Sequence, residues 1–394
     1  VIRGGYGWFY SQTVGLNIAN NAFSSPPGSQ LVTLSGNTTT PDLRYAGKTG
    51  IAPADYFKGL TYGVITGSED TLLNGYTQQY SLSIGHDFGK GFTFETQYLG
   101  SKGTHIETFR DFNSTNTPRS GALASNVPFP QWGRLLGFVS GATSNYNALL
   151  VTAEKRMGEG LAFKTAYTWA KALGGGGGRQ TGGANGNPQN PQNMSLENGR
   201  TSDDMRHRLS VNYVYDLPFG PGKRMAGNTK GAAGKLAGGW KVTGVTAVRS
   251  GLPLNPGVNN ANCNSAFQQS CRADLIGSNF GFLGGSGVDS PRFSRAAFDY
   301  PLNTAAHPAQ APRFGTAGTN ILTGNIINNW DVSIIKNTQI GERKSLEFRF
   351  EMFNVWNHAS FGNPNATVDN ALFGRTTSTA TDPRDIQIAL KLYF

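Results

Sequence analysis

The residues most suggestive of chemistry are Asp203, Asp204 and His207, which precede an alternating segment in an acid–acid–x–x–His spacing. Carboxylates and imidazoles are common metal ligands, but a metal site needs a complete ligand set in a defined geometry. The neighbouring sequence supplies no further ligands, and polar residues at a strand entrance often have the same spacing. We therefore predict no metal site and no cofactor.

Patterns of covalent catalysis are also missing from the sequence. His86, His105, His307 and His358 are isolated from one another, and no Gly-x-Ser-x-Gly motif occurs. The sequence also lacks a cysteine–histidine pair with a third residue placed to orient the histidine. The five-glycine run at 174–178 lacks the Gly-Lys-Ser/Thr end of a phosphate loop. The sequence therefore predicts a protein that is not an enzyme.

The last nine residues alternate without interruption. Side chains on a strand have a period of two, so one face of this segment is apolar and the other is mixed and polar. A strand of an outer-membrane barrel needs one face for lipid and one for a wet interior. The apolar set is Ile386, Ile388, Leu390, Leu392 and Phe394, and the other set is Gln387, Ala389, Lys391 and Tyr393.

Composition favours the same class. Of the 394 residues, 38% are hydrophobic and only 15% are charged, with 53 Gly and 24 Phe, which is typical of long strands joined by polar loops. The net charge of +10 is scattered and lacks the basic stripe with aromatics that nucleic-acid binding requires, so we expect no nucleic-acid partner. One cluster, at 218–240, could touch a membrane surface or keep a turn soluble: Lys223, Arg224, Lys230 and Lys235.

Alternating segments recur in pairs along the whole chain, and we predict an all-β, antiparallel transmembrane β-barrel region of about ten strands. The predicted strands are 1–10, 75–88, 92–106, 145–157, 161–173, 208–217, 239–251, 329–340, 344–356 and 384–394. Connections on one side are mostly short, at 89–91, 158–160, 218–238 and 340–343. Those on the other side are long, as on the exterior of outer-membrane barrels: 11–74, 107–144, 174–204, 252–328 and 358–383.

The polar faces of these strands carry charges that would be costly in a dry core. We expect them to form the wall of a water-filled lumen: Glu95, Glu154, Lys164, Asp331, Glu347, Arg349, Glu351 and Lys391. The outer loops have low complexity, notably the glycine run and the Asn/Pro/Gln repeat at 187–193, and this composition predicts mobility there. Loop 252–328 could instead hold local structure that the cysteines keep in place. Residues 132–140 could form a short extra strand outside the membrane.

Cys263 and Cys271 are the only cysteines, eight residues apart in the loop 252–328. They could close a small loop disulfide in an oxidising compartment, and the alternative is two free thiols. We prefer the disulfide, because a zinc site would need two more ligands nearby.

Several strings resemble the barrel of Oar-like TonB-dependent outer-membrane receptors, and their order and spacing run from Arg3 to Phe394. They include Ser144-Asn-Tyr-Asn-Ala-Leu149, Tyr167-Thr-Trp-Ala-Lys171, Thr201-Ser-Asp-Asp-Met-Arg-His-Arg-Leu-Ser210, Tyr215-Asp-Leu-Pro-Phe-Gly220, Gly239-Trp-Lys-Val-Thr-Gly244, Ser250-Gly-Leu-Pro253, Phe348-Arg-Phe-Glu-Met-Phe-Asn-Val-Trp-Asn-His358, Phe361-Gly-Asn-Pro364 and Pro383-Arg384. The terminal strand is similar to the signal read by the barrel assembly machinery, with Ala389 where Gly is usual: Gln387, Ala389, Leu392 and Phe394.

The resemblance implies that residues 1–394 are the C-terminal portion of a 22-strand barrel, with a plug and a TonB-contacting segment elsewhere in the protein. It implies a receptor in the outer membrane of a Gram-negative bacterium that takes up an unidentified substrate. Implied partners are membrane lipid, the TonB complex, the assembly machinery and an unknown ligand. A passive channel, or an adhesion or assembly protein acting through its loops, stays open. We expect sequence before Val1, and we expect 1–10 and 384–394 not to pair with each other.

Overall fold

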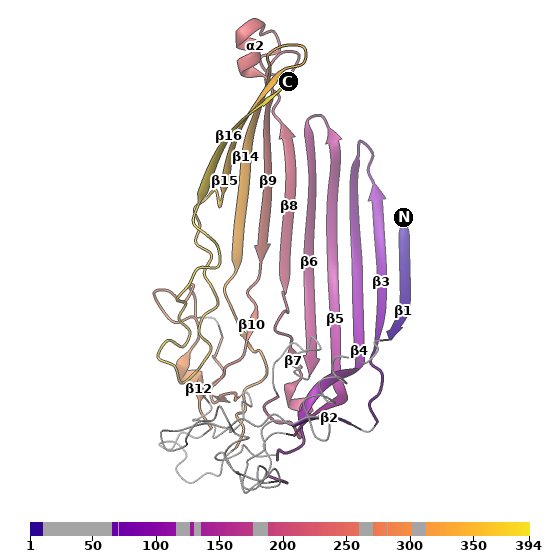
Figure 1. Ribbon diagram of the computed structural model, residues 1–394, viewed down its shortest axis with the longest axis vertical. Coiled ribbons are helices and arrows are strands. Elements are labelled where there is room, and N and C mark those ends of the chain that lie inside the picture. The colour runs from indigo at the N-terminus through magenta and orange to yellow at the C-terminus, as the bar shows by residue number, and fades with distance from the viewer. Residues whose placement is uncertain are drawn as a thin grey trace, which may run out of the picture.

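The computed structural model describes residues 1–10, 65–69, 71–115, 127–129, 135–175, 188–259, 271–281, 283–301 and 313–394. Ten long strands form one antiparallel sheet in the order β1-β3-β4-β5-β6-β8-β9-β14-β15-β16 (Figure 1). Neighbours along this path are also neighbours in the chain, which is the arrangement of successive hairpins. Their bounds are β1 (Ile2–Tyr10), β3 (Tyr76–Asp87), β4 (Phe92–Asp111), β5 (Leu135–Gly158), β6 (Leu161–Gly175), β8 (His207–Asp216), β9 (Trp240–Arg249), β14 (Ile327–Gln339), β15 (Ser345–Phe353) and β16 (Asp385–Tyr393).

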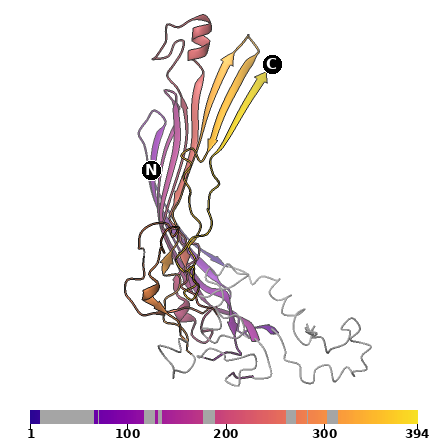
Figure 2. The same ribbon diagram turned by 90° about the vertical axis from the view of Figure 1, so that its left-hand side faces the viewer.

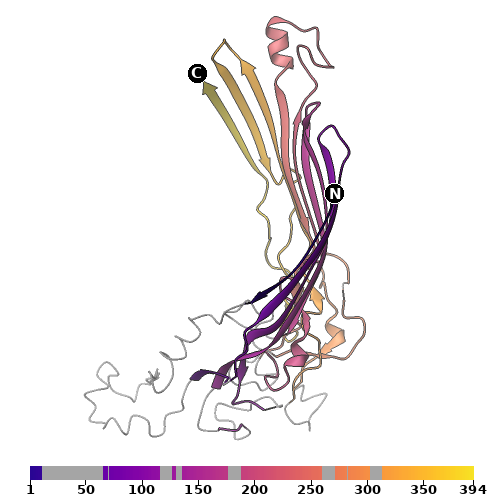
Figure 3. The same cartoon turned by 90° about the vertical axis from the view of Figure 1, so that its right-hand side faces the viewer.

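The ten predicted strands are thus all present, and the predicted antiparallel fold is confirmed. Seen along the sheet from either side, the strands twist and curve, and β14–β16 turn away from β1–β6 (Figures 2 and 3). β1 and β16 form the two edges and do not pair with each other in the described residues, as predicted.

The four connections at the upper end of Figure 1, called here the turn end, are the predicted ones. Tight turns join β3 to β4, β5 to β6 and β14 to β15, whereas the β8–β9 connection carries helix α2 (Gly231–Ala237). Gly160 shows why glycine is needed there. Its φ is +83°, and a Cβ would lie 2.9 Å from the carbonyl oxygen of Asp216 on the next hairpin.

At the opposite end, called the loop end, two strands are longer than predicted. β4 continues to Asp111 and β5 begins at Leu135, so the predicted loop at 107–144 is wrong in extent. The predicted separate strand at 132–140 is instead the outer part of β5, and 132–134 lie outside the described residues. The alternation weakens there because a ladder beyond the lipid needs no apolar face. The register also shifts between Gly103, Ile106 and Thr108.

The remaining elements are short and lie at the loop end. β2 (Ile65–Ser68) pairs parallel with β5, and β7 (Gly199–Arg200) pairs with β6. β10 (Pro253–Leu254) pairs with β13 (Leu322–Thr323), and β11 (Asp274–Leu275) pairs with β12 (Phe298–Asp299). Two 3-10 turns are η3 (Met194–Glu197) and η5 (Arg295–Ala297). The predicted loop at 11–74 lies mostly outside the described residues.

A cluster of buried hydrophobic residues lies among these connections, at the loop end of the sheet. We call the described parts of residues 188–206, 252–326 and 354–383 the loop layer. Its core holds both aromatic and small side chains, including Phe293, Phe298, Leu322, Val368 and Phe373. The described part of loop 252–328 thus holds local structure, as predicted. The expectation of mobility is wrong at residues 188–193, because Gln189 and Asn190 are buried there.

Candidate functional site: a polar face beside the loop layer

The pairing register carries one face of the sheet from strand to strand. Asp331 on β14 pairs with Val245 on β9, which pairs with Asn212 on β8. Asn212 pairs with Lys164 on β6, and Lys164 pairs with Glu154 on β5. The same face includes every charged residue predicted for the wall of the lumen: Glu95, Glu154, Lys164, Asp331, Glu347, Arg349, Glu351 and Lys391. We call it the polar face.

Most charges on the polar face form long, solvent-accessible pairs. Lys164 Nζ lies 3.2 Å from Glu154 Oε2, and both side chains are well exposed. Lys241 pairs with Asp216 at 3.5 Å, and Arg3 with Glu95 at 3.9 Å. Arg349 lies between Glu347 and Glu351. Such alternating, accessible charges suit a surface in contact with water rather than with lipid.

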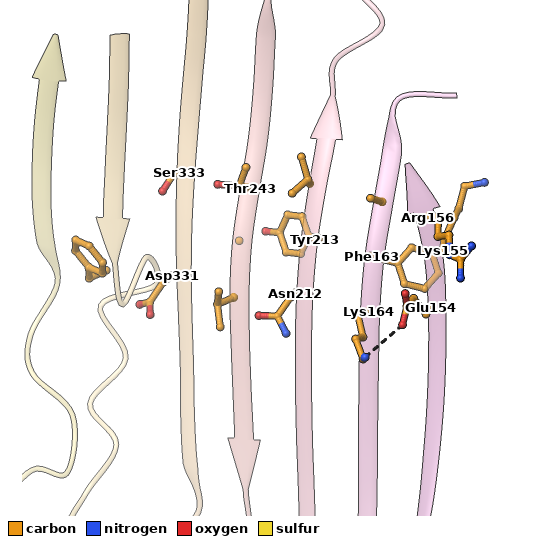
Figure 4. A pocket seen from close by; sticks show the side chains of 15 residues that line it. Glu154, Lys155, Arg156, Phe163, Lys164, Asn212, Tyr213, Thr243, Asp331 and Ser333 are labelled. Atoms are coloured by element: carbon orange, nitrogen blue, oxygen red, sulfur yellow. Dashed lines mark ion pairs between the residues drawn. The ribbon is translucent and has the colours of Figure 1, made fainter. Parts of the chain in front are cut away.

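The polar face is hollowed near its middle. A cavity of about 610 Å³ is lined by side chains from β5, β6, β8, β9 and β14, among them Lys164, Asn212 and Asp331 (Figure 4). A second cavity of about 550 Å³ lies toward β1 and shares Glu154 and Lys164 with the first. The two therefore meet at this ion pair and form one broad, shallow groove across the sheet.

The opposite face is apolar and exposed. It carries Leu82, Phe94, Trp169 and, on the last strand, Ile388 and Leu390, each more than a third exposed. The register joins the last strand to the rest of this face, since Ile388 pairs with Phe350 and Leu390 with Phe348. Apolar surface of this extent is unfavourable in water and suits contact with lipid chains. We call it the apolar face.

The strand-entrance residues that suggested a metal site do not converge. Asp204 is buried and accepts hydrogen bonds from Arg200 Nε at 2.8 Å, Arg206 Nη2 at 3.3 Å and the Ala172 amide at 2.8 Å. His207 Nδ1 lies 2.8 Å from the Tyr167 hydroxyl, on the apolar face. Among the described residues, no group of three His, Cys, Asp or Glu side chains could hold a metal ion. His307 lies outside them.

The loop layer contains a buried ionic cluster that sequence reasoning missed. Arg272 Nη1 lies 2.7 Å from Glu197 Oε2, and both side chains are almost fully buried. The same guanidinium donates from Nε to the Ala317 carbonyl at 2.8 Å, and Glu197 Oε1 accepts the Gln189 amide at 2.9 Å. Gln189 in turn accepts a hydrogen bond from the Arg272 amide at 2.7 Å. No local pattern announces this contact, because 75 residues separate Arg272 from Glu197.

Two further arginines hold the loop layer together. Arg292 donates to the carbonyls of Gly285, Thr323 and Gly324, and burial lowers the pKa of its guanidinium. Arg313 forms a two-pronged pair with the Asp274 carboxylate, and this hydrogen bonding raises the pKa of Arg313. Cys271 is buried in the core and disulfide-bonded. Cys263 lies outside the described residues, so its pairing stays a prediction.

The four residues of the predicted barrel-assembly signal on the last strand do not share one face of the sheet. Gln387 and Ala389 pair with Glu351 and Arg349 on the polar face, whereas Leu392 pairs with Leu346 on the apolar face. Phe394 is 92% exposed beyond the end of β16. Among the described residues, no helix has the length and apolar character needed to cross a membrane.

A curved antiparallel sheet with one charged, solvent-accessible face and one apolar face is typical of a β-barrel membrane protein. The chain belongs to the family described as "Outer membrane beta barrel domain", whose model matches residues 1–387. It is accordingly a protein of the Gram-negative outer membrane. None of the curated protein sequences matches it.

Among solved structures, the chain is similar to the outer membrane transporter YddB from Escherichia coli, at 9% identity and a TM-score of 0.45. That similarity covers 100% of this chain and 38% of YddB. It is also similar to the pyoverdine outer membrane receptor FpvA from Pseudomonas aeruginosa, at 13% identity and a TM-score of 0.36, covering 83% of this chain and 31% of FpvA. The chain thus spans about a third of the length of these proteins.

Proposed function

We propose that this chain is the barrel part of a TonB-dependent outer-membrane receptor that takes up an unidentified substrate. The observation that carries the proposal is the continuous polar face, which crosses all ten strands and runs toward a folded loop layer at one end. The sequence strings that resemble Oar-like receptors support the same assignment. The polar face would line the lumen, the loop end would face the exterior and the turn end the periplasm.

In this proposal no bond is made or broken by the chain. The loop layer captures the substrate, and the groove around Glu154 and Lys164 offers hydrogen-bonding and charged groups along the lumen wall. Energy comes from the TonB complex acting on a plug elsewhere in the protein. The barrel assembly machinery recognises β16 through Gln387, Ala389, Leu392 and Phe394.

Two other functions follow from the same fold. A passive channel needs the same polar face but no plug. A surface adhesion or assembly protein would use the loop layer, whose hydrophobic core and buried ion pair give it the rigidity of a binding surface.

The test uses the full-length protein. We expect purified protein in a planar bilayer to show no steady KCl conductance, and to bind the isolated periplasmic domain of TonB. Steady conductance without TonB binding would establish the passive channel. If the protein shows neither conductance nor TonB binding, and deletion of loop residues 271–301 abolishes cell adhesion, the protein is an adhesion protein.

A further inference from the structure

The β8–β9 connection differs from the other three connections at the turn end. Residues 217–239, called here the α2 turn, carry a helix that extends beyond the ends of β8 and β9 and lies beside the upper part of β14, whereas the other turns are tight (Figures 1 and 2). The α2 turn contains four basic residues and no acidic one: Lys223, Arg224, Lys230 and Lys235. Turning the chain around requires neither the helix nor the charge.

Two side chains on the apolar face bind the end of the helix. The indole of Trp240 donates to the carbonyl oxygen of Leu236 at 2.9 Å. Lys336 Nζ donates to the carbonyl oxygen of Lys235 at 2.7 Å and lies over the Trp240 ring. Trp240 and Lys336 are a cross-strand pair that shares its face with Phe348 and Leu390. The end of α2 is therefore held at the turn end of the apolar face.

Close backbone packing fixes the shape of the α2 turn. A Cβ on Gly220 would lie 2.3 Å from Gly238 Cα, and a Cβ on Gly239 would lie 2.0 Å from the Asn337 carbonyl oxygen. Both glycines have positive φ. The helix is thus seated on the β14 strand as a built element of the fold.

The free surface of the α2 turn combines charge with apolar side chains. Leu236 is 73% exposed and Met225 is 50% exposed, and the four basic residues are also exposed. A basic surface with exposed apolar residues is the pattern of segments that lie in a membrane interface. The absence of acidic residues from the α2 turn matches an anionic surface and not a zwitterionic one.

We propose that the α2 turn binds lipid at the membrane surface on the turn end of the sheet. Leu236 enters the boundary between headgroups and acyl chains, and the basic residues contact the phosphates of anionic phospholipids. The Trp240 and Lys336 contacts hold the helix in this position. A periplasmic protein is the competing occupant, and a nitroxide depth measurement separates the two.

The experiment places a nitroxide at position 236 by Leu236→Cys in the full-length protein, reconstituted in phosphatidylcholine vesicles containing phosphatidylglycerol. The control is Gly341→Cys on the β14–β15 turn, where a Cβ meets open space. We expect the label at 236 to collide more with oxygen than with an aqueous nickel complex, and the label at 341 to do the reverse. Equal exposure of both labels to the nickel complex would overturn the proposal.

A second measurement tests the charges. In the triple variant Lys223→Gln, Lys230→Gln, Lys235→Gln, we expect the lipid-embedded population of the label to fall by up to about fivefold per lysine. The matched triple variant Lys90→Gln, Arg343→Gln, Lys344→Gln should leave that population unchanged. A label at 236 that is indifferent to phosphatidylglycerol and to the first variant would exclude recognition of anionic lipid.

Discussion

The sheet and the loop layer differ in where their apolar and charged side chains are buried. The sheet leaves its apolar face open, with Ile388 two-thirds exposed, and ion pairs such as Lys164–Glu154 are accessible to solvent. The loop layer packs Phe293 and Phe298 in its own core and buries the Arg272–Glu197 pair. The sheet thus depends on the membrane for burial of its surface, whereas the loop layer is self-contained in the way of a small water-soluble domain.

This difference determines where single substitutions act. In the loop layer, a buried charge left without its partner has no water to replace it. On the polar face, water replaces a lost partner at little cost. On the apolar face, the cost depends on what the new side chain meets in the lipid.

The largest effect is expected for Glu197→Ala. The change removes the acceptor of Arg272 Nη1 and of the Gln189 backbone amide and leaves the buried guanidinium charge without its partner, which costs about 3–5 kcal/mol. Hydrogen exchange of residues 188–206 should accelerate by about two to four orders of magnitude. The control, Glu351→Ala, removes an accessible partner of Arg349 on the polar face and should cost under about 1 kcal/mol. Unchanged exchange in the first variant would show that the loop layer is not held by this pair.

The next effect concerns the two faces of one strand. Ile388→Arg places a charge on the apolar face near the middle of β16, where it should cost about 2–4 kcal/mol in a bilayer. Gln387→Arg, one residue away, places the same charge opposite Glu351 on the polar face and should be close to neutral. Denaturant unfolding of the vesicle-embedded protein measures both. Equal costs would mean that the two faces do not meet different solvents.

The ten strands could be predicted because the period-two signal is local and needs no knowledge of partners. Residues 386–394 carry that signal unbroken, and the lengths of the connections then indicate how the strands are ordered. The predicted ends of β4 and β5 are wrong because the prediction depends on this alternation. Once the ladder leaves the lipid, the apolar face disappears from the sequence while the hydrogen bonds continue.

The loop layer could not be predicted in the same way. Arg272 and Glu197 meet across 75 residues, and neither stands in a periodic pattern. The Asn/Pro/Gln repeat at 187–193 has the composition of a disordered segment, yet Gln189 is buried through hydrogen bonds and not through apolar contacts. Composition indicates how much apolar surface a segment can bury. It therefore does not reveal a polar segment that is buried through hydrogen bonds beside an apolar core.

A smaller effect is expected for Cys271→Ser. If Cys263 is its partner, the bond closes a loop of about nine residues, and its loss should cost about 2–3 kcal/mol on the chain-entropy model. The effect should be confined to the loop layer, because Cys271 packs in that core. Hydrogen exchange should rise in residues 271–281 and stay constant in β4 and β5. Mass spectrometry after alkylation without reductant tests the pairing directly, and a free thiol at Cys263 would refute it.

The smallest effect is expected at the Lys164–Glu154 pair, and the same measurement can be made on the buried pair of the loop layer. A double-mutant cycle on Lys164 and Glu154, with Gln at each position, should give a coupling energy below about 1 kcal/mol. High salt should abolish it, since accessible charges are screened. The same cycle on Arg272 and Glu197 should give a larger coupling that salt barely changes. If the Lys164–Glu154 coupling were also large and resistant to salt, the polar face would not be in contact with water. The assignment of this face to a wet lumen would then be wrong.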